Sequence, residues 1–226
     1  MSCRRALRGP MAFAALAFSL SLLAALLLPQ HARADTHAPP LVLLDGSQPT
    51  IPLAQRSTWW VDDSGALSVQ DVESAQYRLP FVTRSEEHRL RLRDGAAMWV
   101  RFEAMATDDG QRWELELARS GTDRISLYYR QANGEWKAQH AGDRIAVRNW
   151  AFPDRYPVFS LDPRINTPVT YFVRIEHARV PFSGSLQIHD HNTLRELRIH
   201  QQFLLGAYFG LALLLAATAV ANALVF

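Results

Sequence analysis

The segment AMWVRFEAM, residues 97–105, alternates in hydropathy with a period of two. One face of an extended chain would carry only apolar side chains, those of Met98, Val100 and Phe102. The opposite face would carry a mixed set, Trp99, Arg101 and Glu103. Because successive side chains of a strand point to opposite faces, this period predicts a half-buried antiparallel strand.

The same pattern recurs elsewhere in the chain. Three further segments alternate in this way: RWELEL (112–117), RISLYY (124–129) and TYFVRIE (170–176). Turn-forming sequences separate the apolar runs: DDSG (62–65), RDG (93–95), TDDG (107–110), NG (133–134) and FSG (182–184). Many short strands at such spacing predict a mainly β fold, a β-sandwich over residues 41–190. We favour a jelly roll over an immunoglobulin-like arrangement.

Two local features refine this prediction. Asn133-Gly134 lies between two strand-like runs and predicts a tight hairpin turn. The segment LSVQDVESAQ (67–76) is the one stretch of the sandwich region that favours a short helix. Ser68 is a good N-cap for that helix, and Asp71 falls at its third position.

The first residues have the features of a secretory signal peptide. Arg4, Arg5 and Arg8 form a basic start, and residues 11–28 carry no charge. Small residues at Ala32 and Ala34 predict cleavage before Asp35. We therefore expect a signal peptide over 1–34 and a flexible lead over 35–40. An uncleaved membrane anchor is the alternative.

Removal of residues 1–34 reverses the charge balance. This segment holds four of the 24 basic residues and no acid, so 20 basic residues face 22 acidic ones and the net charge becomes −2. Such a chain does not offer the basic surface that nucleic acid requires.

The only cysteine, Cys3, leaves with the signal peptide, which excludes disulfides, thiol catalysis and cysteine metal sites. Export without disulfides fits a bacterial periplasm.

The strand-like alternation of apolar and polar residues ends near Asp190. The segment HDHNTLRELRIHQQ (189–202) predicts a short linker helix over 191–202 that begins near Asn192 or Thr193. Residues 203–226 carry no formal charge and as a helix would be roughly 36 Å long, enough for a hydrocarbon core of ~30 Å. We expect one transmembrane helix here, the first of a bundle whose remainder lies outside the sequence.

No catalytic motif is present: G-x-S-x-G, the Walker loop, G-x-G-x-x-G and H-E-x-x-H are all absent from the sequence. Aromatic rings beside hydrogen-bonding groups are the better indication of a binding site for sugars or other small ligands. Five residues are the candidate ligand contacts: Trp99, Arg101, Tyr128, Arg148 and Trp150. The competing interpretation is that the rings cover sandwich edges and that the arginines form cross-strand ion pairs. Trp113, by contrast, falls on an apolar face and is predicted to be core.

Three other chemistries are weaker alternatives. His189 and His191 could contribute to a metal site, but no third ligand is evident, and solvated residues at a strand–helix junction explain them better. Paired acids at 62–63 and 108–109 could bind calcium, although aspartates are ordinary in turns. A glycosidase would need two facing carboxylates, drawn from the strand-face acids Glu103, Glu114, Glu116 and Glu176.

The order of several motifs resembles a known receptor family. The motifs are WVRF (99–102), DRISLYY (123–129), AGDRIAVR (141–148), VFSL (158–161), TYFVRIE (170–176) and GAYFGLALLLA (206–216). Together, over residues 41–226, they resemble the periplasmic sensor domain and first membrane helix of bacterial seven-transmembrane receptors with diverse intracellular signalling modules. The helix motif contains Gly206 and Gly210, a spacing that suits close helix packing.

This resemblance implies a jelly roll akin to carbohydrate-binding modules, seven membrane helices and a cytoplasmic output domain. That output is a diguanylate cyclase, a histidine kinase or a phosphatase, and none of these is encoded in the 226 residues. We therefore expect a non-enzymatic sensor at the bacterial inner membrane that binds a carbohydrate or other small ligand. The alternative is an interaction module that forms homodimers or binds a protein without any small ligand.

Overall fold

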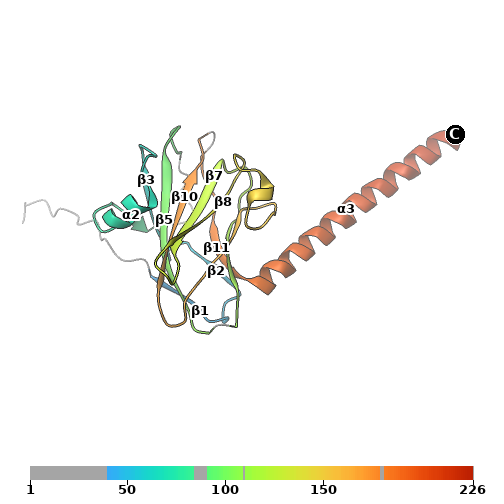
Figure 1. Cartoon of the computed structure of the whole chain (residues 1–226). Helices are drawn as coiled ribbons and strands as arrows, with labels where there is room; N and C mark the ends of the chain where they lie inside the picture. Colours follow the sequence, from blue (N-terminus) through green and yellow to red (C-terminus); the bar gives the residue numbers. More distant parts are fainter. Residues whose placement is uncertain (1–39, 84–90, 109, 179–180, 226) are drawn as a thin grey trace, which may run out of the picture. The chain divides into compact units, whose positions relative to one another are not determined.

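The computed structural model describes residues 40–83, 91–108, 110–178 and 181–225. In this part of the chain two β-sheets pack face to face as a sandwich (Figure 1). The predicted signal peptide over 1–34 and nearly all of the predicted lead over 35–40 lie outside the described residues. The predicted β-sandwich is confirmed.

The larger sheet contains seven strands within the described residues, in the order β4-β3-β5-β10-β7-β8, with β1 also beside β5. Its pairings are antiparallel, except that β1 runs parallel to β5. The strands are β1 (Leu41–Leu44), β3 (Thr58–Asp62), β4 (Val82–Thr83), β5 (Ala97–Ala106), β7 (Arg124–Arg130), β8 (Trp136–Ala141) and β10 (Val169–Glu176). The smaller sheet is antiparallel, in the order β2-β11-β6-β9. Its described strands are β2 (Thr50–Pro52), β6 (Trp113–Leu117), β9 (Val158–Ser160) and β11 (Leu186–Asp190).

All four alternating segments form strands, namely β5, β6, β7 and β10. Their apolar faces meet between the sheets, where Phe102 of β5 and Tyr171 of β10 stack with ring centroids 5.0 Å apart. The small sheet faces them with Leu115, Phe159 and Ile188, all fully buried. Trp113 is also buried, as predicted. The core therefore follows from the period-two pattern.

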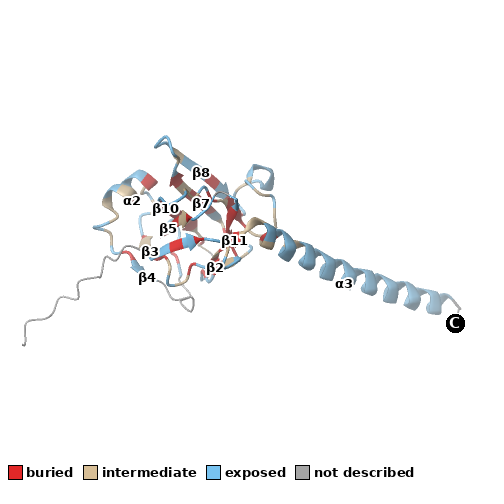
Figure 2. Ribbon diagram, turned by 90° about the horizontal axis from the view of Figure 1, so that it is seen from below, coloured by how far each residue is buried: buried red, intermediate tan, exposed pale blue. Residues whose placement is uncertain are grey.

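A second apolar cluster lies on the other face of the large sheet. The short helix α2 (Val69–Ala75) begins with the expected capping box of Ser68 and Asp71. It packs Val69 and Val72 against Trp99 of β5. Both faces of β5 are therefore largely buried, and the prediction of a half-buried strand is wrong at this position (Figure 2). A period of two reports alternation of side chains but does not reveal whether a helix covers the polar face.

The predicted hairpin between β7 and β8 is confirmed. Gly134 adopts φ +83°, and its N–H donates to the Gln131 carbonyl. A short 3-10 helix, η1 (Val147–Asn149), follows β8. The jelly-roll path of the strands is not confirmed and stays a prediction.

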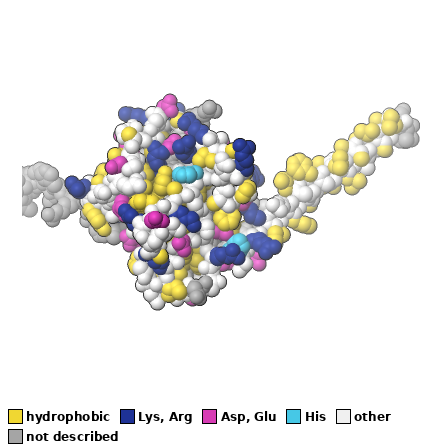
Figure 3. Space-filling view, in the orientation of Figure 1, with side chains coloured by type: hydrophobic (Ala, Val, Ile, Leu, Met, Phe, Trp, Pro, Cys, Tyr) yellow, Lys and Arg dark blue, Asp and Glu magenta, His cyan; other side chains and the backbone are white. Residues whose placement is uncertain are grey.

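The chain continues from β11 into a single long helix, α3 (His191–Val225). The predicted linker and membrane segments are thus parts of one continuous helix. Most of its side chains are exposed, and hydrophobic groups dominate its surface (Figures 2 and 3). Within the described residues, α3 alone is long and apolar enough to cross a membrane.

Candidate functional site

Three of the predicted ligand contacts lie on the outer face of the large sheet, the face that carries α2. Trp99 has 0% of its surface exposed, so the expectation that its ring is reachable is wrong. The Arg101 side chain is also buried, with its guanidinium 3.3 Å from Gln76 Oε1 and 5.1 Å from the Phe81 ring centroid. Tyr128 is half-buried, and its ring centroid lies 6.0 Å from that of Trp99.

The other two predicted contacts lie in a different part of the sandwich. Trp150 follows η1, packs against the core between the sheets, and donates its indole N–H to the Ile145 carbonyl at 2.9 Å. Arg148 lies within η1 and is exposed. The structure therefore brings Trp99, Arg101 and Tyr128 together but places Trp150 in a separate cluster.

The acidic turns adopt ordinary turn geometry. Asp62 is buried and accepts hydrogen bonds from the Ser64 hydroxyl and the Leu67 N–H. These bonds lower the pKa of its carboxyl even though burial acts in the opposite direction. Asp109 lies outside the described residues. In the described part of the chain no group of three or more His, Cys, Asp or Glu side chains could hold a metal ion.

The four strand-face acids do not form a catalytic pair across a cleft. Glu103 and Glu176 belong to the large sheet, whereas Glu114 and Glu116 belong to the small one. Glu176 forms an ion pair with Arg174 on its own strand. Each acid of the small sheet pairs with a group at the start of α3, so neither is available as a free general acid or base.

The start of α3 is fixed by Asp190, which comes directly before the helix. Its Oδ2 accepts the N–H groups of Asn192 at 3.1 Å and Thr193 at 3.2 Å. Asp190 is thus the residue that caps the helix. The helix begins at His191, the first residue of the predicted linker, although the expected start signal lies at Asn192 or Thr193. Because Asp190 also ends β11, strand and helix join without an intervening loop.

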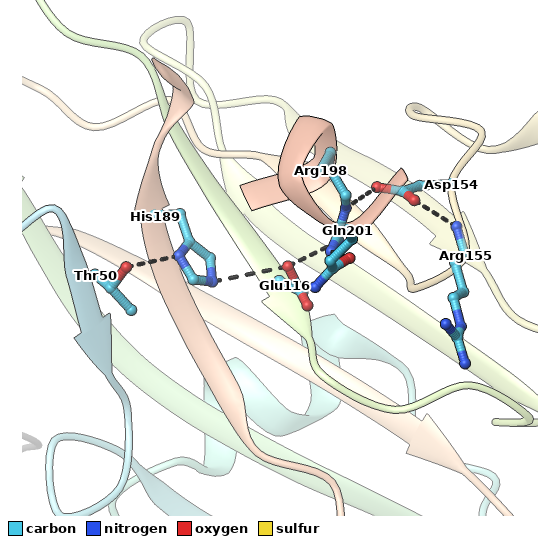
Figure 4. Close-up of polar contacts among 7 residues, drawn as sticks. All are labelled: Thr50, Glu116, Asp154, Arg155, His189, Arg198 and Gln201. Carbon is cyan, nitrogen blue, oxygen red and sulfur yellow. Dashed lines mark hydrogen bonds and ion pairs between the residues drawn. The ribbon is translucent and has the colours of Figure 1, made fainter. Parts of the chain in front are cut away.

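A polar network ties α3 to the sandwich two turns further on (Figure 4). Arg198 donates through Nη2 to Glu116 Oε2 at 2.9 Å and through Nε to Asp154 Oδ2 at 2.6 Å. Its guanidinium also lies over the Tyr156 ring, 5.3 Å from the centroid. One helical side chain therefore joins strand β6 to the segment that follows η1. Only 15% of the Arg198 side chain and 7% of the Glu116 side chain are exposed.

Two histidines flank this network. His191 Nδ1 lies 2.7 Å from Glu114 Oε1. His189 is buried with Nδ1 2.9 Å from the Thr50 hydroxyl, and its Nε2 lies 3.7 Å from Glu116 Oε2 without a hydrogen-bond partner. The prediction of a solvated junction is therefore wrong for His189. Burial lowers the pKa of His189 to about 4, and the Arg198 charge acts in the same direction.

Apolar contact completes this junction, which we define by Glu114, Glu116, Asp154, His189, His191 and Arg198. Leu194 is buried beside it and lines a small hollow together with Phe152 and Val158. Spacings of three and four residues along α3 place His191, Leu194 and Arg198 on one face of the helix. Displacement of the first turns of α3 would leave Glu116 as a buried charge without its cation, which is strongly unfavourable. The sandwich and the start of α3 are therefore energetically linked.

Comparison with known proteins identifies the domain. The family model described as 7TMR-DISM extracellular 2 matches residues 54–189, which is more than half of the chain. The chain belongs to this family. No curated protein matches the sequence. The resemblance drawn from the motif order is confirmed.

The 7TMR-DISM match accounts for the architecture on both sides of the junction. The chain carries the extracellular sensor domain of this receptor family, followed by one candidate membrane helix. The matched region ends at His189, two residues before α3 begins. The junction thus lies where the 7TMR-DISM extracellular domain meets the helix.

The buried His189 predicts a loss of stability in acid. Its pKa is about 4 in the fold and 6.5 ordinarily, so the unfolded chain takes up the proton first as the pH falls. The resulting contribution, up to about 3 kcal/mol, is present above pH 6.5 and is lost between about 6.5 and about 4. Burial raises the pKa of Glu116, which offsets part of this loss. Urea unfolding followed by tryptophan fluorescence at a series of pH values measures the net effect.

His189→Asn is the matched control because an amide can replace the hydrogen bond to Thr50 but does not titrate. We expect the variant to be less stable than the wild type at neutral pH and to have a flatter pH dependence. Parallel losses of stability in the two proteins would contradict this role for His189.

Proposed function

We propose that this chain is the periplasmic ligand-sensing module of a transmembrane signalling receptor. The observation that carries the proposal is the junction, in which Arg198 of α3 bonds to both Glu116 and Asp154 of the sandwich. A ligand that favours one arrangement of the sandwich would bias the position of α3 only if the two are energetically linked. The buried ion pairs supply that link.

In this proposal α3 crosses the bacterial inner membrane, and the sandwich lies in the periplasm. Residues 1–34 are a signal peptide, 35–40 a lead, 41–190 the sensor domain, 191–202 the linker and 203–226 the membrane span. The output domain, a diguanylate cyclase or a histidine kinase, lies beyond Phe226. The chain itself carries no catalytic function.

A carbohydrate or other small ligand is the proposed stimulus. Aromatic and arginine side chains are the usual partners of sugar rings and their hydroxyls. On the outer face of the large sheet, three arginines lie over aromatic rings: Arg101 over Phe81, Arg130 over Trp136 and Arg174 over Trp99. Tyr128 is the accessible member of the predicted set there, with Trp99 and Arg101 beneath α2. Arg148 and Trp150 are proposed as contacts at the η1 end.

We expect ligands to raise the melting temperature of the full chain in detergent. All six tryptophans lie between residues 59 and 150, so their fluorescence reports on the sandwich and not on α3. A panel of mono- and disaccharides, with and without calcium, should include at least one that raises the melting temperature by a few degrees, because a ligand stabilises the state that it binds. Tyr128→Leu should reduce that shift.

The alternative is an interaction module that forms homodimers. Gly206 and Gly210 lie one turn apart and leave a short patch on one face of α3 without side chains, which permits close helix contact. If no compound in the panel shifts the melting temperature and sedimentation in detergent shows a concentration-dependent dimer, direct ligand sensing is contradicted and the alternative stands.

A further inference from the structure

A polar groove opens on the outer face of the large sheet, beside α2. It has a volume of about 140 Å³. Six residues from five segments, namely α2, β7, β8, the loop before β10 and β10 itself, carry its chemistry: Glu73, Arg130, Trp136, Arg164, Thr170 and Phe172. None of them is among the residues that the sequence pattern indicated. The groove is smaller than the ~300–1,000 Å³ of sites for drug-sized ligands, which favours a ligand the size of one sugar ring.

The first arginine of the groove is fully engaged by the protein. Arg130 donates to both carboxylate oxygens of Glu73, at 2.8 and 2.6 Å, and to the Gly134 carbonyl at 2.8 Å. Its guanidinium also lies over the Trp136 ring, 4.6 Å from the centroid. These contacts fix one wall of the groove and neutralise the Arg130 charge.

The second arginine is different. Arg164 donates one hydrogen bond, to the Arg130 carbonyl at 2.9 Å, and is half-buried. Among the described residues no carboxylate lies within ion-pair distance of its guanidinium, although Glu103 lies opposite Thr170 on β5. A guanidinium has five N–H donors, so most of those on Arg164 have no protein acceptor in this part of the chain. The groove therefore has one uncompensated cation.

The remaining lining suits a hydroxylated ring. Thr170 brings a hydroxyl group to the groove, and the Glu73 carboxylate keeps lone pairs that can accept further hydrogen bonds. Phe172 and Val169 supply apolar surface beside them. The indole N–H of Trp136 is buried and has no hydrogen-bond partner. A fixed ion pair, a free guanidinium, a hydroxyl and apolar surface thus meet in one small groove.

We infer that this groove binds an acidic monosaccharide, a hexuronate whose carboxylate pairs with Arg164. A planar carboxylate matches the paired N–H donors of a guanidinium, and the fork geometry gives both strength and orientation. The sugar hydroxyls bond to Glu73 and Thr170. This inference rests on the proposed sensing function and names both its site and its ligand class.

Isothermal titration of the full chain in detergent with D-glucuronate and D-galacturonate tests the inference. D-glucose and D-galactose are the matched neutral ligands, and acetate tests for the carboxylate alone. We expect both uronates to bind at least about tenfold more tightly than the neutral sugars or acetate. The neutral sugars lack the carboxylate that pairs with Arg164, and acetate lacks the hydroxyl groups that bond to Glu73 and Thr170. Arg164→Gln should remove that preference, and Arg164→Lys should restore part of it. Arg124→Gln, an exposed arginine at the other end of β7, should leave it unchanged.

The outcomes separate this inference from the proposed function. Equal affinity for uronates and neutral sugars, no binding of either uronate, or an unchanged preference in Arg164→Gln would overturn the acidic-sugar site. Tight neutral-sugar binding that survives in Arg164→Gln would leave the sensing function intact. If uronates bind through Arg164 but do not change amide hydrogen exchange in residues 194–202, the site stands and the relay to α3 fails.

Discussion

Replacing Arg198 with Met is expected to lower the free energy of unfolding of the sandwich by about 3 kcal/mol. The substitution keeps the length and apolar stem of the side chain but removes the cation that compensates Glu116 and Asp154. Glu116 would then be a buried carboxylate without a partner, and its pKa, already raised by burial, would rise further. Urea unfolding followed by tryptophan fluorescence measures the loss.

A double-mutant cycle separates the ion pair from the lost contacts. Glu116→Gln in the Arg198→Met background removes the uncompensated charge, so we expect it to recover at least about 1 kcal/mol of the loss. Arg195→Met is the matched control, because Arg195 is exposed and pairs with no acid among the described residues. If Arg198→Met is no more destabilising than Arg195→Met, the ion pairs do not hold α3 to the sandwich.

The second large effect is expected at Gly65, which follows β3. Its φ of +58° is unfavourable for residues with a side chain, and an added Cβ would lie 1.8 Å from the Gly95 carbonyl oxygen. The Gly65 carbonyl also accepts a hydrogen bond from Arg174 Nη2 at 2.7 Å, which fixes the turn. Because backbone has to move to relieve the contact, we expect Gly65→Ala to destabilise the sandwich by about 4 kcal/mol.

Gly134→Ala isolates the conformational part of this effect. Gly134 also has a positive φ, +83°, but a Cβ there meets no atom within 4 Å. We expect this control to cost about 1 kcal/mol in the same unfolding assay. Similar losses for the two alanine variants would show that the close approach of Gly65 and Gly95 is not rigid.

Much of the fold was predictable because strands of a sandwich alternate apolar and polar residues and are separated by turn-forming residues, and both features can be read from short segments of sequence. Alternation marked β5, β6, β7 and β10, and turn chemistry marked the hairpin at Gly134. The helix α2 was predicted from its cap, Ser68 and Asp71, but its position over β5 was not. A helix of two turns, with Val69 and Val72 as its buried positions, is too short to show an amphipathic period. Trp99 therefore looked like a residue that alternates toward solvent.

The junction depends on ion pairs between residues that are far apart in the sequence, and no pattern within a short segment predicts such pairs. Glu116 and Arg198 are 82 positions apart, and each alone has the appearance of a solvated charge on an amphipathic element. The sequence did offer two indirect signs. Glu114 and Glu116 share one face of β6, and His191, Leu194 and Arg198 share one face of the helix. Only the pairing of β6 with β11 brings these two faces together.

Hydrogen exchange of the full chain in lipid nanodiscs tests the central claim, that the sandwich and the start of α3 form one linked unit. In the wild type, the amides of residues 195–199 should be as protected as those of β6 and β11. In Arg198→Met they should exchange at least about tenfold faster, since about 1.4 kcal/mol of lost coupling corresponds to that factor, while residues 206–220 stay unchanged. Unchanged exchange of residues 195–199 in Arg198→Met would contradict the linkage and, with it, the proposed route of the signal into the membrane.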